Sequence, residues 1–84
     1  MPEPVLDAPD MVARERTDDK GRRWWHLTST PSGQILGSIQ WHGPRRAYCF
    51  LTVPGCAFNH SCLQAIVKFL QTANEQHRKE KHNA

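Results

Sequence analysis

The stretch Gln34-Ile35-Leu36-Gly37-Ser38-Ile39-Gln40-Trp41-His42 decides the fold of this chain. Large apolar side chains recur at every second position of its second half, which is typical of a β-strand whose two faces meet different surroundings. We expect one face to carry Ile35, Gly37, Ile39 and Trp41, and the other to carry Leu36, Ser38, Gln40 and His42. The flanking sequence predicts the neighbours of this strand.

Turn signals bound the strand on both sides, at Pro31-Ser32-Gly33-Gln34 and at Gly43-Pro44-Arg45-Arg46. Beyond them lie two segments rich in aromatic and β-branched residues, WWHLTST at 24–30 and AYCFLTV at 47–53. Such segments favour strands. Because the connections are short, we expect hairpins and therefore an antiparallel meander of three strands.

A helix is predicted after Pro54-Gly55. Leu63, Ile66, Val67 and Leu70 follow the i, i+3, i+4, i+7 spacing of one helix face, and Cys62, Phe69 and Ala73 widen the stripe. We expect the helix to run to about Asn74 and to fray through the last ten residues.

Two residues compete as the helix N-cap. Asn59 would place Phe58 opposite Leu63 as a hydrophobic staple, whereas Ser61 would place Gln64 at the capping-box position. The interpretation favours Asn59.

These elements define the expected architecture. The predicted class is α+β: a three-stranded antiparallel β-meander followed by one C-terminal amphipathic helix (β-β-β-α), with a disordered N-terminal tail. Residues 1–20 are rich in Pro, Asp, Glu and Arg without an apolar period, so they are interpreted as a flexible acidic tail. Residues 21–84 are expected to form a single domain.

One helix can cover only one face of a sheet. The third strand offers Tyr48 and Phe50 on one face and Cys49 and Leu51 on the other, and Trp24 and Trp25 divide in the same way. We therefore expect an apolar patch on the open face, which would serve a partner or a homodimer.

Charge is distributed unevenly. Residues 1–19 hold six acids and two arginines, a net charge of −4, whereas residues 20–84 hold nine Lys or Arg and two acids, a net charge of +7. A basic domain attracts nucleic acid or an acidic protein surface. Solubility alone is the alternative explanation.

Few residues could support catalysis. The predicted domain contains only two carboxylates, Glu75 and Glu80, and no glycine-rich phosphate loop. A Cys62 nucleophile beside His60 is a weaker interpretation than a small core cysteine. The interpretation is therefore a binding protein rather than an enzyme, without a cofactor.

Zinc is the other alternative. Cys56, His60 and Cys62 could supply three ligands, with Cys49, His42 or His26 as a fourth, but the paired Cys-x2-4-Cys knuckle is missing. No zinc site is therefore predicted.

Two clusters combine arginines with aromatic rings. Arginine forks bind phosphate or carboxylate, and rings stack on bases or fill protein pockets. The candidate partner-binding residues are Arg22, Arg23, Trp24, Trp25, Trp41, His42, Arg45, Arg46 and Tyr48.

The pattern G-x-I-x-W (37–41), R-x-Y-x-F (46–50), a short Pro-Gly loop and C-L-x-x-I-x-x-F (62–69) resembles a family of small, mostly uncharacterised phage and prophage proteins. The resemblance covers residues 24–74. It departs at Pro44-Arg45-Arg46, where an aromatic residue is expected beside the proline. It implies an origin in a mobile element and no particular activity.

Two functions follow as hypotheses. The first is a phage-encoded protein that binds and inhibits a host protein or ribonucleoprotein, in the manner of anti-defence or anti-CRISPR proteins. The alternative is nucleic-acid binding, because a three-stranded sheet backed by a helix resembles the arm-binding domains of phage integrases. The N-terminal stretch lacks the pattern of a secretory signal, which predicts a cytoplasmic location in a bacterial host, without a membrane partner.

Overall fold

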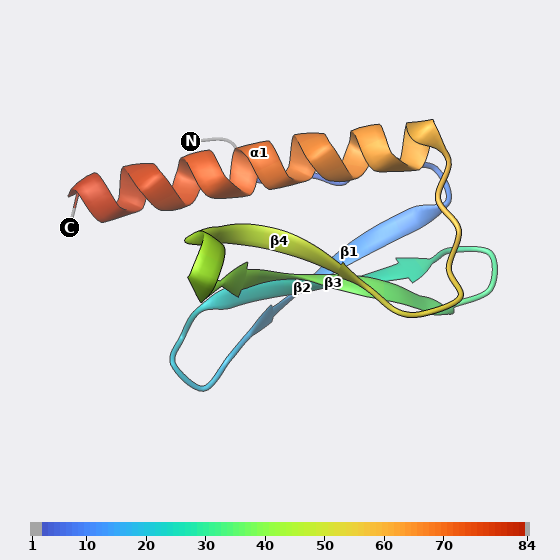
Figure 1. Cartoon of the computed structure of the whole chain (residues 1–84), viewed down its shortest axis with the longest axis horizontal. Helices are drawn as coiled ribbons and strands as arrows, with labels where there is room; N and C mark the ends of the chain where they lie inside the picture. Colours follow the sequence, from blue (N-terminus) through green and yellow to red (C-terminus); the bar gives the residue numbers. More distant parts are fainter. Residues whose placement is uncertain (1–2, 84) are drawn as a thin grey trace.

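The computed structural model describes residues 3–83, and the side chains of residues 3–80. It contains a four-stranded antiparallel sheet and one C-terminal helix (Figure 1). The strands are β1 (Met11–Thr17), β2 (Arg23–Ser29), β3 (Ile35–His42) and β4 (Ala47–Thr52), in the spatial order β1-β2-β3-β4. A short 3-10 turn, η1 (Gly43–Arg45), joins β3 to β4, and α1 (His60–Asn83) follows. The α+β meander with a C-terminal helix is confirmed.

The number of strands was wrong, because β1 forms within the segment expected to be a disordered tail. Met11 is buried and Ala13 lies opposite Leu27 of β2. Arg14, Glu15 and Arg16 follow, all exposed. Charged residues are what an edge strand uses to discourage pairing with another chain, so the sequence of β1 suits its position.

The segment before β1 lies along the helix-covered side of the sheet (Figure 1). Leu6 and Ala8 pack against the core, and Glu3 contacts Arg23 and Gln76. Residues 3–10 therefore belong to the folded unit. Met1 and Pro2 lie outside the described residues.

A register shift near the start of β3 changes the expected faces there. Thr28 lies opposite Ile35, whereas Leu27 lies opposite Gly37, so β3 has one extra residue at this point. As a result Leu36 packs against the core and Ile35 is 51% exposed, the reverse of the expected order. From Gly37 to His42 the strand alternates as predicted, with Ile39 fully buried.

The helix begins as predicted and ends later. Asn59 is the N-cap, because its Oδ1 accepts a hydrogen bond from the Cys62 backbone N–H at 2.9 Å. The expected end near Asn74 was wrong: α1 continues to Asn83, and Gln76 is buried in the added turns. Ala84 lies outside the described residues.

The buried stripe of α1 is rotated from the expected one. Ile66, Phe69 and Ala73 are buried as predicted and Ala65 is buried beside them, whereas Leu63 is 47% and Val67 is 50% exposed. The small alanines let the helix approach the sheet closely. The proposed Phe58–Leu63 staple does not hold Leu63 in place, and Phe58 instead packs edge-on against Phe50, with ring centroids 5.4 Å apart.

Asn74 completes the free edge of β4. Its Oδ1 accepts a hydrogen bond from the Tyr48 backbone N–H at 2.6 Å, and its Nδ2 donates one to the Tyr48 carbonyl at 3.3 Å. The side-chain amide thus replaces one residue of a neighbouring strand. These two hydrogen bonds fix α1 along the free edge of β4.

Gly37 provides a direct test of the packing at the centre of the sheet. A Cβ there would overlap the Leu51 carbonyl oxygen and lie 2.9 Å from Phe50 Cε1. We expect Gly37→Ala to lower the free energy of unfolding by about 1–3 kcal/mol, measured by urea denaturation. Gly43→Ala is the matched control because a Cβ at Gly43 meets nothing within 4 Å. Equal stability of the two variants would contradict this packing.

Candidate nucleic-acid interface

The face of the sheet opposite α1 is open and carries no carboxylate within its strands. The strand pairings direct the following residues to this face: Val12, Arg14, Arg16, Trp24, His26, Thr28, Ile35, Ser38, Gln40, His42, Ala47, Cys49 and Leu51. The four strands contain one acid, Glu15, and it points to the helix-covered side with Trp25 and Arg23. The open face therefore combines basic and polar side chains with two exposed apolar ones, Ile35 at 51% and Leu51 at 44% exposure, so the apolar patch expected there makes up only part of it.

The basic residues of the open face lie directly beside its aromatic ones. Arg16 is opposite Trp24 and Arg14 is opposite His26 in the β1–β2 pairing. The rings of Trp24 and His26 meet edge-on, with centroids 4.4 Å apart. Two guanidinium groups and a half-buried tryptophan thus share one patch, which we call the open-face patch: Arg14, Arg16, Trp24, His26 and Gln40.

A hollow of about 370 Å³ adjoins the patch where β2 begins and β3 ends. Trp24, Trp41, Gln40 and Arg22 line it, with Thr17, Asp18 and Arg23. Gln40 Nε2 donates a hydrogen bond to Ser38 Oγ at 2.9 Å, which holds the amide in place. We call this space the two-tryptophan hollow.

The loop between β1 and β2 forms one wall of this hollow and is held by its own hydrogen bonds. Asp18 Oδ1 accepts hydrogen bonds from the backbone N–H groups of Lys20 at 2.9 Å and Arg22 at 2.8 Å. The Asp18 N–H donates to the Arg22 carbonyl at 2.9 Å, and Gly21 adopts φ 80° to close the turn. Arg22 therefore extends from a defined backbone, and its guanidinium carbon lies 5.8 Å from the Trp41 ring centroid.

Trp41 is half-buried between the sheet and the helix. Its ring lies 4.3 Å from the imidazole of His77 and 5.6 Å from Tyr48, measured between centroids. It borders the two-tryptophan hollow on one side and a second hollow, between α1 and β4, on the other. The predicted role of Trp41 as a contact residue is compatible with this position.

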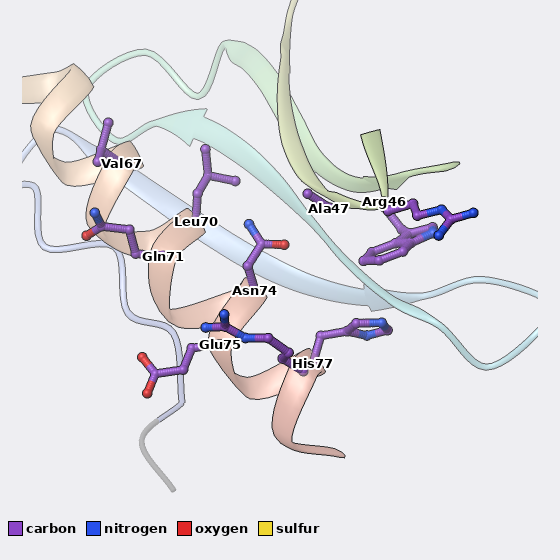
Figure 2. A pocket seen from close by; sticks show the side chains of 10 residues that line it. Arg46, Ala47, Val67, Leu70, Gln71, Asn74, Glu75 and His77 are labelled. Carbon is purple, nitrogen blue, oxygen red and sulfur yellow. The ribbon is translucent and has the colours of Figure 1, made fainter. Parts of the chain in front are cut away.

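The second hollow measures about 720 Å³ and is lined by both charged and apolar residues. Figure 2 shows Leu70 and Asn74 projecting from α1 toward Ala47, and Arg46 extending from the turn before β4. Arg46 is exposed and adopts a left-handed backbone, φ 51°. Arg45 is exposed in η1, while His42 is half-buried on the open face. We call this space the α1–β4 groove.

Two predicted contact residues belong to the core. Trp25 is 4% and Tyr48 is 7% exposed, and Trp25 meets Tyr48 and Phe69 edge-on. Burial also raises the pKa of Tyr48, so the phenol stays neutral. The expectation that these two rings face a partner was wrong because their strand positions point toward α1.

Arg23 is committed to internal contacts. Its guanidinium pairs with Glu3 and with Glu15, donates to Gln76 Oε1 at 3.2 Å, and lies 5.1 Å from the Trp25 ring centroid. These contacts hold the N-terminal segment, β1 and α1 together. The assignment of Arg23 as a partner contact is therefore corrected to a structural one.

Sequence reasoning missed Arg14 and Arg16, which lay in the presumed tail. The signal that could have found them is the short apolar run Met11-Val12-Ala13 directly before Arg14.

The three cysteines, Cys49, Cys56 and Cys62, are free and half-buried. Among residues 3–80, no three His, Cys, Asp or Glu side chains gather as a metal site would require. The zinc alternative through Cys56, His60 and Cys62 therefore has no geometric support.

Comparison with protein-family models, with curated proteins and with solved structures finds no match to this chain. Within the described part of the chain, α1 lacks the apolar length that crossing a membrane would require. The open-face patch and its adjoining hollow must accordingly be interpreted from their own chemistry.

The Glu3 contact with Arg23 gives the fold a pH dependence. The hydrogen bond from Arg23, followed by that from Gln76, lowers the pKa of Glu3. A lowered pKa stabilises the fold above the ordinary glutamate value of about 4.3 and loses that contribution as the pH falls through the folded-state pKa. We expect Glu3→Gln to reduce the loss of stability between neutral pH and about pH 3.

Urea-unfolding midpoints at the two pH values measure this effect. Asp7→Asn is the matched control, because Asp7 lies exposed on the same segment. An identical acid dependence in the wild type and Glu3→Gln would show that the Arg23 contact does not act in solution.

Proposed function

We propose that this chain is a non-catalytic nucleic-acid-binding module and that the open face of its sheet is the binding surface. The observation that carries the proposal is the absence of carboxylates from that face of the strands, together with Arg14, Arg16, His26 and Trp24. Phosphate attraction accounts for most of the affinity of sequence-independent nucleic-acid binding. A basic strand face without carboxylates provides this attraction and does not repel the phosphates.

Different residues of the open-face patch would contact different parts of a nucleic acid. Arg14 and Arg16 would neutralise phosphates, and the Gln40 amide can pair with the edge of a base. The ring of Trp24 offers an apolar surface to a base or sugar. All of these side chains extend from paired strands rather than from loops, which keeps their spacing fixed.

Salt dependence tests the proposal. We expect the affinity for a short fluorescent oligonucleotide to fall steeply with salt, because bound phosphates release counterions. Arg16→Gln should weaken binding and reduce the slope of log affinity against log salt by about 1. Anisotropy titrations at several salt concentrations measure both quantities.

Lys68→Gln is the control for net charge, since Lys68 is exposed on α1. An equal loss for Arg16→Gln and Lys68→Gln would leave the open face without a special role. A weak signal that does not change with salt would remove the proposal.

The second candidate function is binding of a host protein or ribonucleoprotein, and the α1–β4 groove is the observation that favours it. The groove joins the apolar side chains of Val67 and Leu70 to the cations Arg46 and Arg78. Its one acid, Glu75, is paired with Lys79 at 3.2 Å. Val67 is 50% exposed although it is apolar. A partner segment with acidic and apolar side chains would complement this surface. Inhibition of bacterial defence stays a prediction within this candidate.

Affinity capture from a nuclease-treated bacterial lysate tests the protein partner. We expect wild type to retain a stoichiometric protein and Val67→Ser to lose most of it, because a central apolar contact is removed. Gln64→Ser is the matched control, as Gln64 is exposed on α1 outside the groove. Capture that is absent, or equal for all three proteins, would contradict this function.

A further inference from the structure

We propose that the preferred ligand of the open face is a single strand, with one unpaired base held in the two-tryptophan hollow. This inference rests on the proposed nucleic-acid function and specifies its substrate class. It starts from the juxtaposition of Trp24, Trp41 and Gln40 around one space of about 370 Å³. A hollow of this volume takes a small planar group and not a duplex.

The walls of the hollow match the parts of a nucleotide. Aromatic rings stack on the faces of bases, and a side-chain amide pairs with a base edge. Trp24 supplies a half-buried ring, and the Gln40 amide uses one of its hydrogens on Ser38 and has further hydrogen-bonding capacity. Arg22 also lines the hollow, with its guanidinium carbon 5.8 Å from the Trp41 ring centroid, and would bind the phosphate of the same nucleotide.

The hollow also has the rigidity that a binding site requires. Trp24 is a strand residue paired with Arg16, and Trp41 is held by His77 and Tyr48. The loop that carries Arg22 is closed by hydrogen bonds to Asp18. Asp18 is the only acid among the residues that line the hollow. Its Oδ1 accepts hydrogen bonds from two backbone N–H groups, which offset part of its charge.

Duplex nucleic acid cannot use this arrangement fully. Its bases are stacked inside the helix, and bringing one into a pocket costs the energy of unpairing and unstacking. A single strand presents its bases at lower cost and follows a basic groove with its backbone. Arg14 and Arg16 on β1 continue the basic surface away from the hollow, beside Trp24 and His26. One surface thus offers both a site for a base and a row of basic side chains for the phosphates.

The experiment compares four labelled probes at one salt concentration: a short single-stranded DNA, the same sequence as RNA, the corresponding DNA duplex, and a DNA strand that lacks its bases. We expect the two natural single strands to bind more tightly than the duplex and the base-free strand. Trp24→Leu should weaken single-strand binding by about 5- to 150-fold, the cost of one lost base stack, with little effect on the other two probes. Trp24→Tyr keeps a ring and should retain most of the binding.

Circular dichroism and urea unfolding of both variants confirm that the sheet is intact, so that loss of binding is assigned to the ring. Duplex bound as tightly as single strands, or Trp24→Leu weakening all probes equally, would overturn the single-strand inference while nucleic-acid binding stands. Salt-dependent binding of none of the four probes would overturn both proposals. A difference in affinity between the DNA and RNA single strands identifies which of the two is the preferred ligand.

Discussion

The edge-on contact between Phe69 of α1 and Trp25 of β2 is the interaction on which the rest of the structure depends. Their ring centroids lie 5.0 Å apart at 85°, and Trp25 makes a second edge-on contact with Tyr48 at 5.4 Å. Such pairs contribute about 0.5–1.5 kcal/mol each beyond the burial of their area. The contact determines which face of the sheet is covered. Because strand side chains alternate, it also determines which residues remain for solvent or a ligand.

The same contact organises the charges. Arg23 lies over Trp25 and collects Glu3, Glu15 and Gln76 around it. Two acids of the N-terminal segment and β1 are thereby drawn to the helix-covered side. The opposite face keeps its arginines without acids between them. The acidic N-terminal stretch and the basic domain inferred from composition are thus parts of one folded unit, in which Glu3 and Glu15 are paired with Arg23 on the helix-covered side.

Local signals predicted much of the fold. The alternation around Ile39, the turns at both ends of β3 and the Asn59 cap each act over a few residues, and each was identified correctly. β1 was missed because its residues Arg14, Glu15 and Arg16 are charged. Consecutive charged residues are typical of an edge strand and of a disordered tail alike, so the sequence does not distinguish the two. The helix stripe was predicted in part: Ile66, Phe69 and Ala73 are buried as expected, whereas Leu63 and Val67 are exposed. Ala65 was missed because it is buried by a close approach to the sheet, which hydrophobicity alone does not indicate.

The site was less predictable for a related reason. Trp24 and Trp25 are adjacent in sequence, and only the register of β2 against α1 decides that one belongs to the core and the other to the open face. Composition identified the correct residue types around Arg22, Trp24 and Trp41 but could not separate binding rings from packing rings. Arg14 and Arg16 could be assigned to the site only from the pairing of β1 with β2, which places them opposite His26 and Trp24.

The open-face patch and the α1–β4 groove lie on different elements, and Trp41 borders the hollows beside both. Strand β3 carries Gln40 toward the open face and Trp41 toward the helix, so one strand connects the two surfaces. A ligand in one hollow would therefore contact the same ring that forms the wall of the other. The two proposed functions use different elements and share only the Trp41 ring between their hollows. Contacts with His77 of α1 and Tyr48 of β4 hold the Trp41 ring at this junction, so the helix and the edge strand together set the shape of both hollows.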